Sequence, residues 1–177
     1  MERSARVFFA LWPGESVRAA LHDQGRRLHA GLAGRLTRAA SIHMTLLFLG
    51  EVAETRLDAL HAAAAGVSIE PFSLLLERTA CWRHNRIAWV GPVRTPPALE
   101  DLVAQLRARV DQAGFAFDRK PFAAHVTLVR NANCRPLDDT IQPIEWAVRD
   151  FVLVRSAREA GGSDYAVIGR WGGGEVT

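Results

Sequence analysis

The chain has 177 residues, a length that fits one domain or two small lobes sharing an interface. Its content of 49% hydrophobic and 23% charged residues is that of an ordinary globular protein and argues against long disordered segments. The formal net charge of +3 is mild, so the charge alone does not indicate a dedicated nucleic-acid-binding protein.

The first half of the chain predicts strand, helix, strand and helix in that order. Residues 7–12 are apolar but too few for a signal segment or a membrane span, so they are predicted to be a buried strand. Apolar residues then recur at helical spacing over 17–32. A second β-rich run covers 42–49, and a short helix with one apolar face follows around 57–64.

The second half predicts a hairpin, a helix and further strands. These elements are the hairpin strands 72–76 and 87–90, a helix over 97–113, a strand over 122–129, and β-like runs at 146–154 and 165–168. Strand, helix and histidine-bearing strand therefore occur twice, with an offset of about 80 residues, which is typical of two duplicated lobes rather than of a solenoid.

Each copy of this repeat contains the sequence His-x-Thr-Leu. The copies are His43 to Leu46 and His125 to Leu128, at matching places in the two halves. Successive side chains of a strand alternate between its faces, so the histidine and the threonine of each copy share one face while the residues between and after them share the other. Each strand can therefore bury an apolar face and present an imidazole and a hydroxyl to a cleft.

This residue set suits cleavage of a phosphate ester. An imidazole titrates near neutrality, so His43 and His125 can act together as acid and base, one taking a proton from water and the other protonating the departing alkoxide. The hydroxyls of Thr45 and Thr127 can donate to the non-bridging phosphoryl oxygens, where negative charge must be held. The near symmetry of the two motifs leaves open which histidine is the acid.

A structural interpretation exists for each motif alone. A single histidine on a strand is usually a partly buried group whose hydrogen bonds are satisfied by the backbone. A structural role does not require the same histidine and threonine twice in register with a repeat, so the pair favours a catalytic site.

The sequence resembles the two-histidine (2H) phosphoesterase superfamily, and in particular the bacterial and archaeal RNA 2′,3′-cyclic phosphodiesterases once described as 2′-5′ RNA ligases. The resemblance covers nearly the whole chain. It depends on the segments 6–10, 43–51, 121–122 and 125–130, and on Tyr165, Arg170 and Trp171 near the end.

The resemblance implies an α+β fold in which residues 1–177 form a single bilobal domain, with two antiparallel sheets, helices outside and the active cleft between the lobes. It also implies that the substrate is an RNA end bearing a 2′,3′-cyclic phosphate, which is opened to a 2′-phosphate.

Three further residues are candidates for substrate contacts. Arg130 carries a cation suited to phosphate, but strict alternation points it away from His125 unless a bulge or the strand end redirects it. Phe9 is close to the first motif in the family pattern and is a candidate to stack a base, although a core position is an alternative. Trp82 is a similar candidate.

No cofactor is predicted, and no carboxylate cluster or His/Asp spacing indicates a metal site. The two cysteines, Cys81 and Cys134, are far apart in the sequence and form no C-x-x-C motif, so we expect neither a disulfide framework nor a zinc knuckle. A reducing cytoplasm, no association with membranes and a monomer are the corresponding expectations.

Two other functions remain open at this stage. One keeps the site but acts on another small cyclic phosphate or on a 2′-5′ linked oligonucleotide. The other is a non-catalytic protein that binds RNA ends. Retention of both histidines and both threonines argues against the second function, because binding alone could use arginines.

Overall fold

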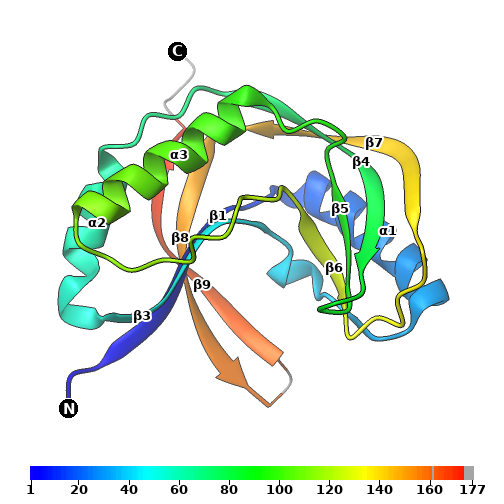
Figure 1. The fold of residues 1–177 in the computed structure, drawn as a ribbon, viewed down its shortest axis with the longest axis horizontal. Helices are drawn as coiled ribbons and strands as arrows, with labels where there is room; N and C mark the ends of the chain where they lie inside the picture. Colours follow the sequence, from blue (N-terminus) through cyan, green and yellow to red (C-terminus); the bar gives the residue numbers. More distant parts are fainter. Residues whose placement is uncertain (161, 174–177) are drawn as a thin grey trace.

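The computed structural model describes residues 1–160 and 162–173, which form three α-helices and two antiparallel sheets (Figure 1). The first sheet has four strands in the order β3-β1-β8-β9. These are β1 (Ser4–Leu11), β3 (Met44–Ala53), β8 (Asp150–Glu159) and β9 (Gly162–Gly172). Strand β1 is between β3 and β8, and six of its eight residues are buried.

The second sheet has five strands in the order β2-β6-β5-β4-β7. These are β2 (Arg35–Leu36), β4 (Phe72–Trp82), β5 (Ile87–Gly91), β6 (Val126–Arg130) and β7 (Asp138–Val148). Strands β4 and β5 form the predicted hairpin. Strand β2 has only two residues, and it pairs with the edge of β6.

The helices are exchanged between the two repeated halves. Helix α1 (Glu15–Leu32) follows β1 of the four-stranded sheet but packs against β6 and β7 of the five-stranded sheet. Helix α3 (Pro97–Gln112) follows β5 of the five-stranded sheet but contacts β3, and α2 (Leu57–Ala65) contacts α3 and β9. Figure 1 shows α2 and α3 over one sheet and α1 behind the other. The two repeated helices, α1 and α3, therefore each pack on the sheet of the other half, while α2 stays on the sheet of its own half.

One apolar cluster joins the two sheets. Buried residues of β1, β3, β4, β5, β6 and all three α-helices belong to it. Helix α3 illustrates the pattern, because it starts with Pro97 in its first turn and buries a stripe at helical spacing. The stripe consists of Leu99, Leu102, Val103, Leu106 and Val110. Two short 3₁₀ turns, Ala39–Ser41 and Glu54–Arg56, complete the connections.

The α+β fold with two antiparallel sheets is confirmed, and so is the repeated order of strand, helix and strand, but β3 and β6 start directly after His43 and His125 and do not include them. The single β-run predicted over 146–154 is wrong. The chain leaves the five-stranded sheet at Val148 and enters the four-stranded sheet at Asp150, with only Arg149 between. The apolar pattern continues through this crossing, so the sequence carries no sign of it. Of the helices described, none has the length and apolar content needed to cross a membrane.

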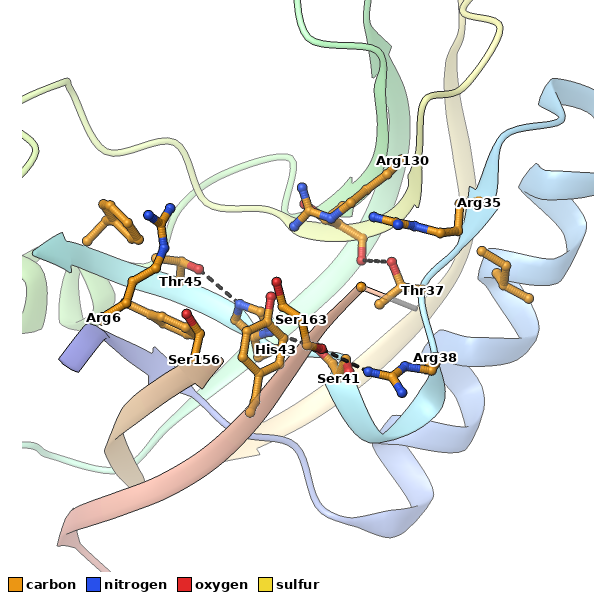
Figure 2. Close-up of a pocket in the computed structure, with 16 residues that line it drawn as sticks. Arg6, Arg35, Thr37, Arg38, Ser41, His43, Thr45, Arg130, Ser156 and Ser163 are labelled. Atoms are coloured by element: carbon orange, nitrogen blue, oxygen red, sulfur yellow. Dashed lines mark hydrogen bonds between the residues drawn. The ribbon is translucent and has the colours of Figure 1, made fainter. Parts of the chain in front are cut away.

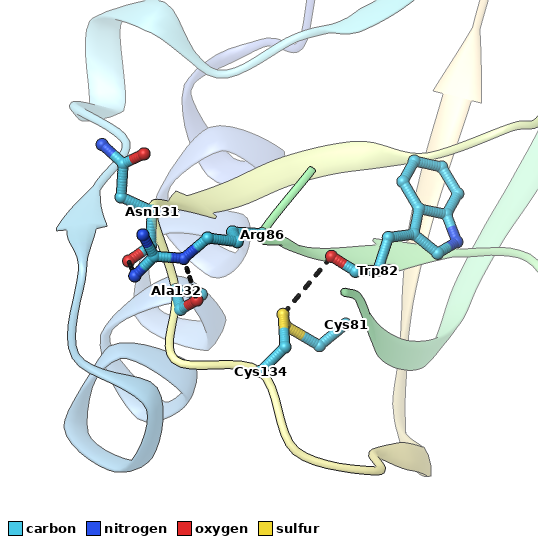
Figure 3. The surroundings of a disulfide bond; sticks show 6 residues. All are labelled: Cys81, Trp82, Arg86, Asn131, Ala132 and Cys134. Carbon is cyan, nitrogen blue, oxygen red and sulfur yellow. Dashed lines mark hydrogen bonds between the residues drawn. A yellow bond between two sulfur atoms is a disulfide. The ribbon is translucent and has the colours of Figure 1, made fainter. Parts of the chain in front are cut away.

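The two cysteines form a disulfide, contrary to the expectation from their spacing (Figure 3). The Cα atoms of Cys81 and Cys134 are 5.6 Å apart, although 53 positions separate them in the sequence. Cys81 is near the end of β4, and Cys134 is in the loop between β6 and β7. Arg86 fixes this loop, because its guanidinium donates to the carbonyl oxygens of Asn131 and Ala132, at 3.2 Å in each case. The pairing is a product of the tertiary fold, which spacing cannot reveal.

Candidate functional site

A cavity of about 330 Å³ opens between the two sheets (Figure 2). His43, Thr45, Thr127 and Arg130 are among its lining residues, so it brings together four of the predicted site residues from both halves of the chain. Each histidine directly precedes a strand, β3 in one case and β6 in the other. His125 is not part of the cavity lining itself.

His43 is held in one tautomer by its neighbours. Its Nδ1 donates to the carbonyl oxygen of Ser41 at 2.7 Å, and its Nε2 is 3.0 Å from the hydroxyl oxygen of Thr45. A carbonyl oxygen only accepts, so Nδ1 carries the proton, and Nε2 of the neutral ring accepts from Thr45. Nε2 is therefore the atom available for proton transfer.

His125 repeats this arrangement. Its Nδ1 donates to the carbonyl oxygen of Ala123 at 2.7 Å, again two residues upstream in the chain. Among the described residues, Nε2 of His125 has no hydrogen-bond partner. The same backbone contact thus orients both imidazoles, with the Nε2 atoms left for chemistry.

Both imidazoles are neutral in the unliganded protein near pH 7. The pKa of His43 is lowered to about 4, mainly by burial and to a smaller extent by electrostatic repulsion from Arg130, His125 and Arg18, against the opposing effect of the Ser41 carbonyl. Burial also lowers the pKa of His125, and the charge of Arg130 adds to this effect. A bound phosphate would oppose these effects, because a nearby negative charge favours the protonated ring.

Both motif strands have a β-bulge directly after the threonine. In β3, Thr45 is opposite Ala10 and Leu47 is opposite Phe9, so Leu46 is an extra residue. In β6, Thr127 is opposite Trp89 and Val129 is opposite Ala88, so Leu128 is the extra residue. The two leucines and the residues after them are all buried. A bulge of this kind changes the alternation of faces by one position.

The bulges decide which residue follows threonine on the cavity side. Strict alternation directs Arg130 away from the cavity, but the extra residue in β6 returns it to the same side as Thr127. In β3 the equivalent position is Phe48, which also lines the cavity. The two halves of the site therefore differ at this position, with the aromatic ring of Phe48 in one half and the cation of Arg130 in the other.

Phe9 is not a contact residue of this cavity. Its side chain has no exposed surface and packs between Phe151 and Trp171 in the core, at ring-centroid distances of 6.1 and 6.0 Å. The prediction that Phe9 binds substrate is therefore wrong. In β1 the side chains of Phe8 and Ala10 point to the cavity side, and Phe8 lines the cavity.

Aromatic rings surround both histidines, and the sequence reasoning missed most of them. Trp12 is stacked on His43 with 5.7 Å between centroids, and the edge of Tyr165 approaches the same ring at 5.2 Å. Trp82 meets the His125 ring at 4.6 Å in a T-shaped contact. Trp82 therefore packs against His125, one of the two candidate catalytic residues. The rings supply the low-polarity surroundings that depress both pKa values.

Three more arginines line the cavity: Arg6, Arg35 and Arg38. Arg6 belongs to the segment 6–10 that carries the family resemblance, but nothing in the local sequence singles out Arg35 or Arg38. Within 1–160 and 162–173, no three His, Cys, Asp or Glu side chains are close enough together to hold a metal ion.

Residues 14–160 match the family model described as the 2′-5′ RNA ligase superfamily. The chain belongs to this superfamily. The match spans both His-x-Thr motifs.

Relatives in this superfamily match over most of their length. An RNA 2′,3′-cyclic phosphodiesterase of Escherichia coli is 32% identical over 97% of this chain and 98% of its own, and one of Thermus thermophilus is 31% identical over 92% and 87%. The crystal structure of E. coli LigT complexed with 3′-AMP superimposes with a TM-score of 0.85 at 29% identity, covering 98% of this chain and all of the other. The whole fold, not the motif strands alone, is shared.

Proposed function

We propose that this protein hydrolyses 2′,3′-cyclic phosphodiester ends of RNA to 2′-phosphates, with His43 and His125 as the acid and base and without a metal ion. The observation that carries the proposal is the matched pair of imidazoles, each with Nδ1 bonded to a carbonyl oxygen two residues upstream and with Nε2 left for proton transfer. The relatives named for this activity support the substrate class.

The proposed reaction requires two proton transfers at phosphorus. One imidazole takes a proton from the attacking water through Nε2, the water oxygen bonds to phosphorus, and the bond from phosphorus to the ribose 3′ oxygen breaks. The other imidazole, protonated, gives its proton to that 3′ oxygen. The product keeps the phosphate on the 2′ oxygen.

The threonines and Arg130 serve the charge that develops on the phosphoryl group. The hydroxyls of Thr45 and Thr127 donate to the non-bridging oxygens, and the guanidinium of Arg130 contributes a third donor with a full charge. In the resting site the Thr45 hydroxyl donates to His43 instead. Substrate binding exchanges this bond for one to phosphate and exposes the Nε2 lone pair.

The decisive experiment incubates the protein with a nucleoside 2′,3′-cyclic phosphate in the presence of EDTA and identifies the product. We expect turnover to the 2′-phosphate. Activity that is lost with EDTA and restored by zinc or manganese would contradict a metal-independent reaction. Binding without product would support the alternative of an RNA-end-binding protein, and turnover only of other cyclic phosphates or of 2′-5′ linkages would support the alternative substrates.

The roles of the histidines are separated by variants. His43→Ala and His125→Ala should each lower the rate by about 10² to 10⁴, while His22→Ala on helix α1 serves as the matched control. The double variant should lose far less than the product of the two, because the two groups act as a unit. A nucleotide ester with a nitrophenyl leaving group needs no acid, so it should rescue one variant and not the other. Equal rescue of both would refute the division into acid and base.

The location and assembly predicted from the sequence remain predictions. We propose a monomer, because the site described above is completed within one chain. The cytoplasm is also a proposal, and it requires the Cys81–Cys134 bond to persist in a reducing compartment. Gel filtration and fractionation test these two points.

A further inference from the structure

The cavity continues from the catalytic groups to a cationic strip formed by Arg35, Arg38 and Arg130. Figure 2 shows the side chains of Arg35 and Arg130 close together and extending in the same direction, with Arg38 below Thr37. Arg35 and Arg130 are directly opposite each other in the β2–β6 pair, so their side chains share one face of the sheet. We propose that Arg35 and Arg38 of this strip bind the phosphate on the 5′ oxygen of the nucleotide whose 2′,3′-cyclic phosphate is at the histidines, while Arg130 contacts the cyclic phosphate itself.

Two like charges in directly opposite positions of a sheet repel and destabilise it. No carboxylate offsets this repulsion within the described chain, because none of the ion pairs formed there includes Arg35, Arg38 or Arg130. Arginine is suited to phosphate because its planar fork donates two parallel hydrogen bonds. An anion between these guanidinium groups would turn the repulsion into attraction.

The strip is fixed to the catalytic strand. The N–H of Thr37 donates to the carbonyl oxygen of Leu128 at 2.9 Å, and its hydroxyl donates to the carbonyl oxygen of Thr127 at 3.2 Å. Arg38 donates to the carbonyl oxygen of Ser163 at 2.8 Å, which ties the strip to β9. A phosphate held here therefore has a defined position relative to Thr127.

The opposite end of the cavity is a weaker anion site. Arg6 is there, but its guanidinium is placed over the Phe48 ring, with 4.8 Å to the centroid. Its cross-strand neighbour is Glu51, an opposite charge, whereas the cross-strand neighbour of Arg35 is another arginine. The net positive charge is therefore greater at the Arg35 end of the cavity, and this end is the one proposed to bind the 5′-phosphate.

The proposal rests on the proposed function and names its substrate class. A chain of RNA always carries a phosphate on the 5′ oxygen of its last nucleotide, whereas a nucleoside 2′,3′-cyclic phosphate does not. The strip therefore favours RNA ends over free cyclic mononucleotides.

The test compares kcat/KM for three substrates that share one base: the nucleoside 2′,3′-cyclic phosphate, the same compound with a 5′-phosphate, and the dinucleotide ending in the cyclic phosphate. We expect the wild type to prefer the dinucleotide over the unphosphorylated nucleoside. The Arg35→Gln and Arg38→Gln variants should each reduce this preference roughly tenfold, the lower range for a hydrogen bond to a charged group. If the 5′-phosphate alone raises kcat/KM, a phosphate monoester is sufficient for binding to the strip. If only the dinucleotide has a raised kcat/KM, the strip binds the phosphodiester.

Two controls separate the strip from general effects of charge. Arg149→Gln removes one exposed positive charge outside the cavity and should leave the preference unchanged. Arg35→Lys keeps the charge and should retain part of the preference. The dependence of log(kcat/KM) on log salt for the dinucleotide should become shallower by about 0.7 in Arg35→Gln, the value for one lost phosphate contact on a single strand.

A wild type that hydrolyses the unphosphorylated nucleoside as efficiently as the dinucleotide overturns the proposal. So does a preference that survives in the Arg35→Gln, Arg38→Gln double variant. Failure of the wild type to hydrolyse any of the three substrates would instead refute the proposed function, so the two failures are distinguishable.

Discussion

Substitution of Gly91 tests whether close packing of strand β5 against the segment before β6 positions His125. Gly91 ends strand β5, next to Val90, which is paired with Val126 at the start of β6. A Cβ atom at this position would be 2.6 Å from the carbonyl oxygen of Ala124 and 2.9 Å from Cζ3 of Trp89. The absence of a side chain therefore allows the segment that carries His125 to lie directly against β5.

The Gly91→Ala substitution should displace this segment. Non-bonded contacts of carbon atoms are comfortable at about 3.5 Å, so the Ala124 carbonyl must retreat by somewhat less than 1 Å. The hydrogen bond from His125 Nδ1 to Ala123 moves with it, because that carbonyl belongs to the same segment. A misplacement of about 1 Å at a catalytic group costs up to about 100-fold in rate, so we expect kcat to fall roughly 10- to 100-fold with little change in KM.

The assay is steady-state hydrolysis of a cyclic nucleotide together with thermal unfolding. Gly169→Ala is the matched control, because its Cβ would be 2.5 Å from Cη2 of Trp171 on β9, a comparable clash outside the cavity lining. Both variants should lower the melting temperature, but only Gly91→Ala should lower kcat in the folded protein. A normal kcat in folded Gly91→Ala, or an equal loss in both, would refute the reasoning.

Three further predictions concern the threonines, acid pH and the disulfide. Thr45→Val and Thr127→Val should keep the fold, since valine suits a strand, but should each lower kcat roughly 10- to 1,000-fold in a steady-state assay. Thr140→Val on β7 is the control. Unchanged turnover in Thr45→Val and Thr127→Val would show that these threonines have only a structural role. The folded-state pKa of His43 is about 4 against 6.5 for a free imidazole, so its contribution to stability is complete above pH 6.5 and is lost as the pH falls toward 4. Urea unfolding at pH 7 and pH 4.5 should therefore show a loss on the order of 2 kcal/mol that His43→Gln removes, and an identical pH dependence in that variant would contradict the assignment. Removal of the disulfide, by the double variant Cys81→Ser, Cys134→Ser or by reduction of the wild type, should lower the free energy of unfolding by about 2 to 4 kcal/mol, because the bond closes a loop of 53 positions. Thermal or urea unfolding measures this loss. An unchanged free energy of unfolding would show that the bond does not form in solution.

The sequence was informative wherever a local pattern repeats. The helices over 15–32 and 97–112 and the strands after His43 and His125 follow from apolar periodicity, and their duplication in the chain revealed the pairing of the two motifs. The superfamily was also recognisable from the motifs themselves, and the match over 14–160 confirms it.

Other features depend on contacts that no local pattern encodes. The orientation of Arg130 is decided by the bulge at Leu128, and alternation alone predicts the opposite face. Phe9 and Phe8 have the same hydrophobic character, so the sequence could not tell which of them faces the core. Arg35 belongs to a strand of two residues, too short to show any periodicity.

The difference between Phe48 and Arg130 gives the site a polarity. If both halves carried the same residue after the bulge, the two motif segments by themselves would not distinguish a ligand from the same ligand turned by half a rotation. A cation on one side only makes the two orientations unequal in energy for any ligand with an unsymmetrical charge. Divergence at a single position of a duplicated motif can thus commit each copy to one proton transfer, while the segments that hold the imidazoles stay alike.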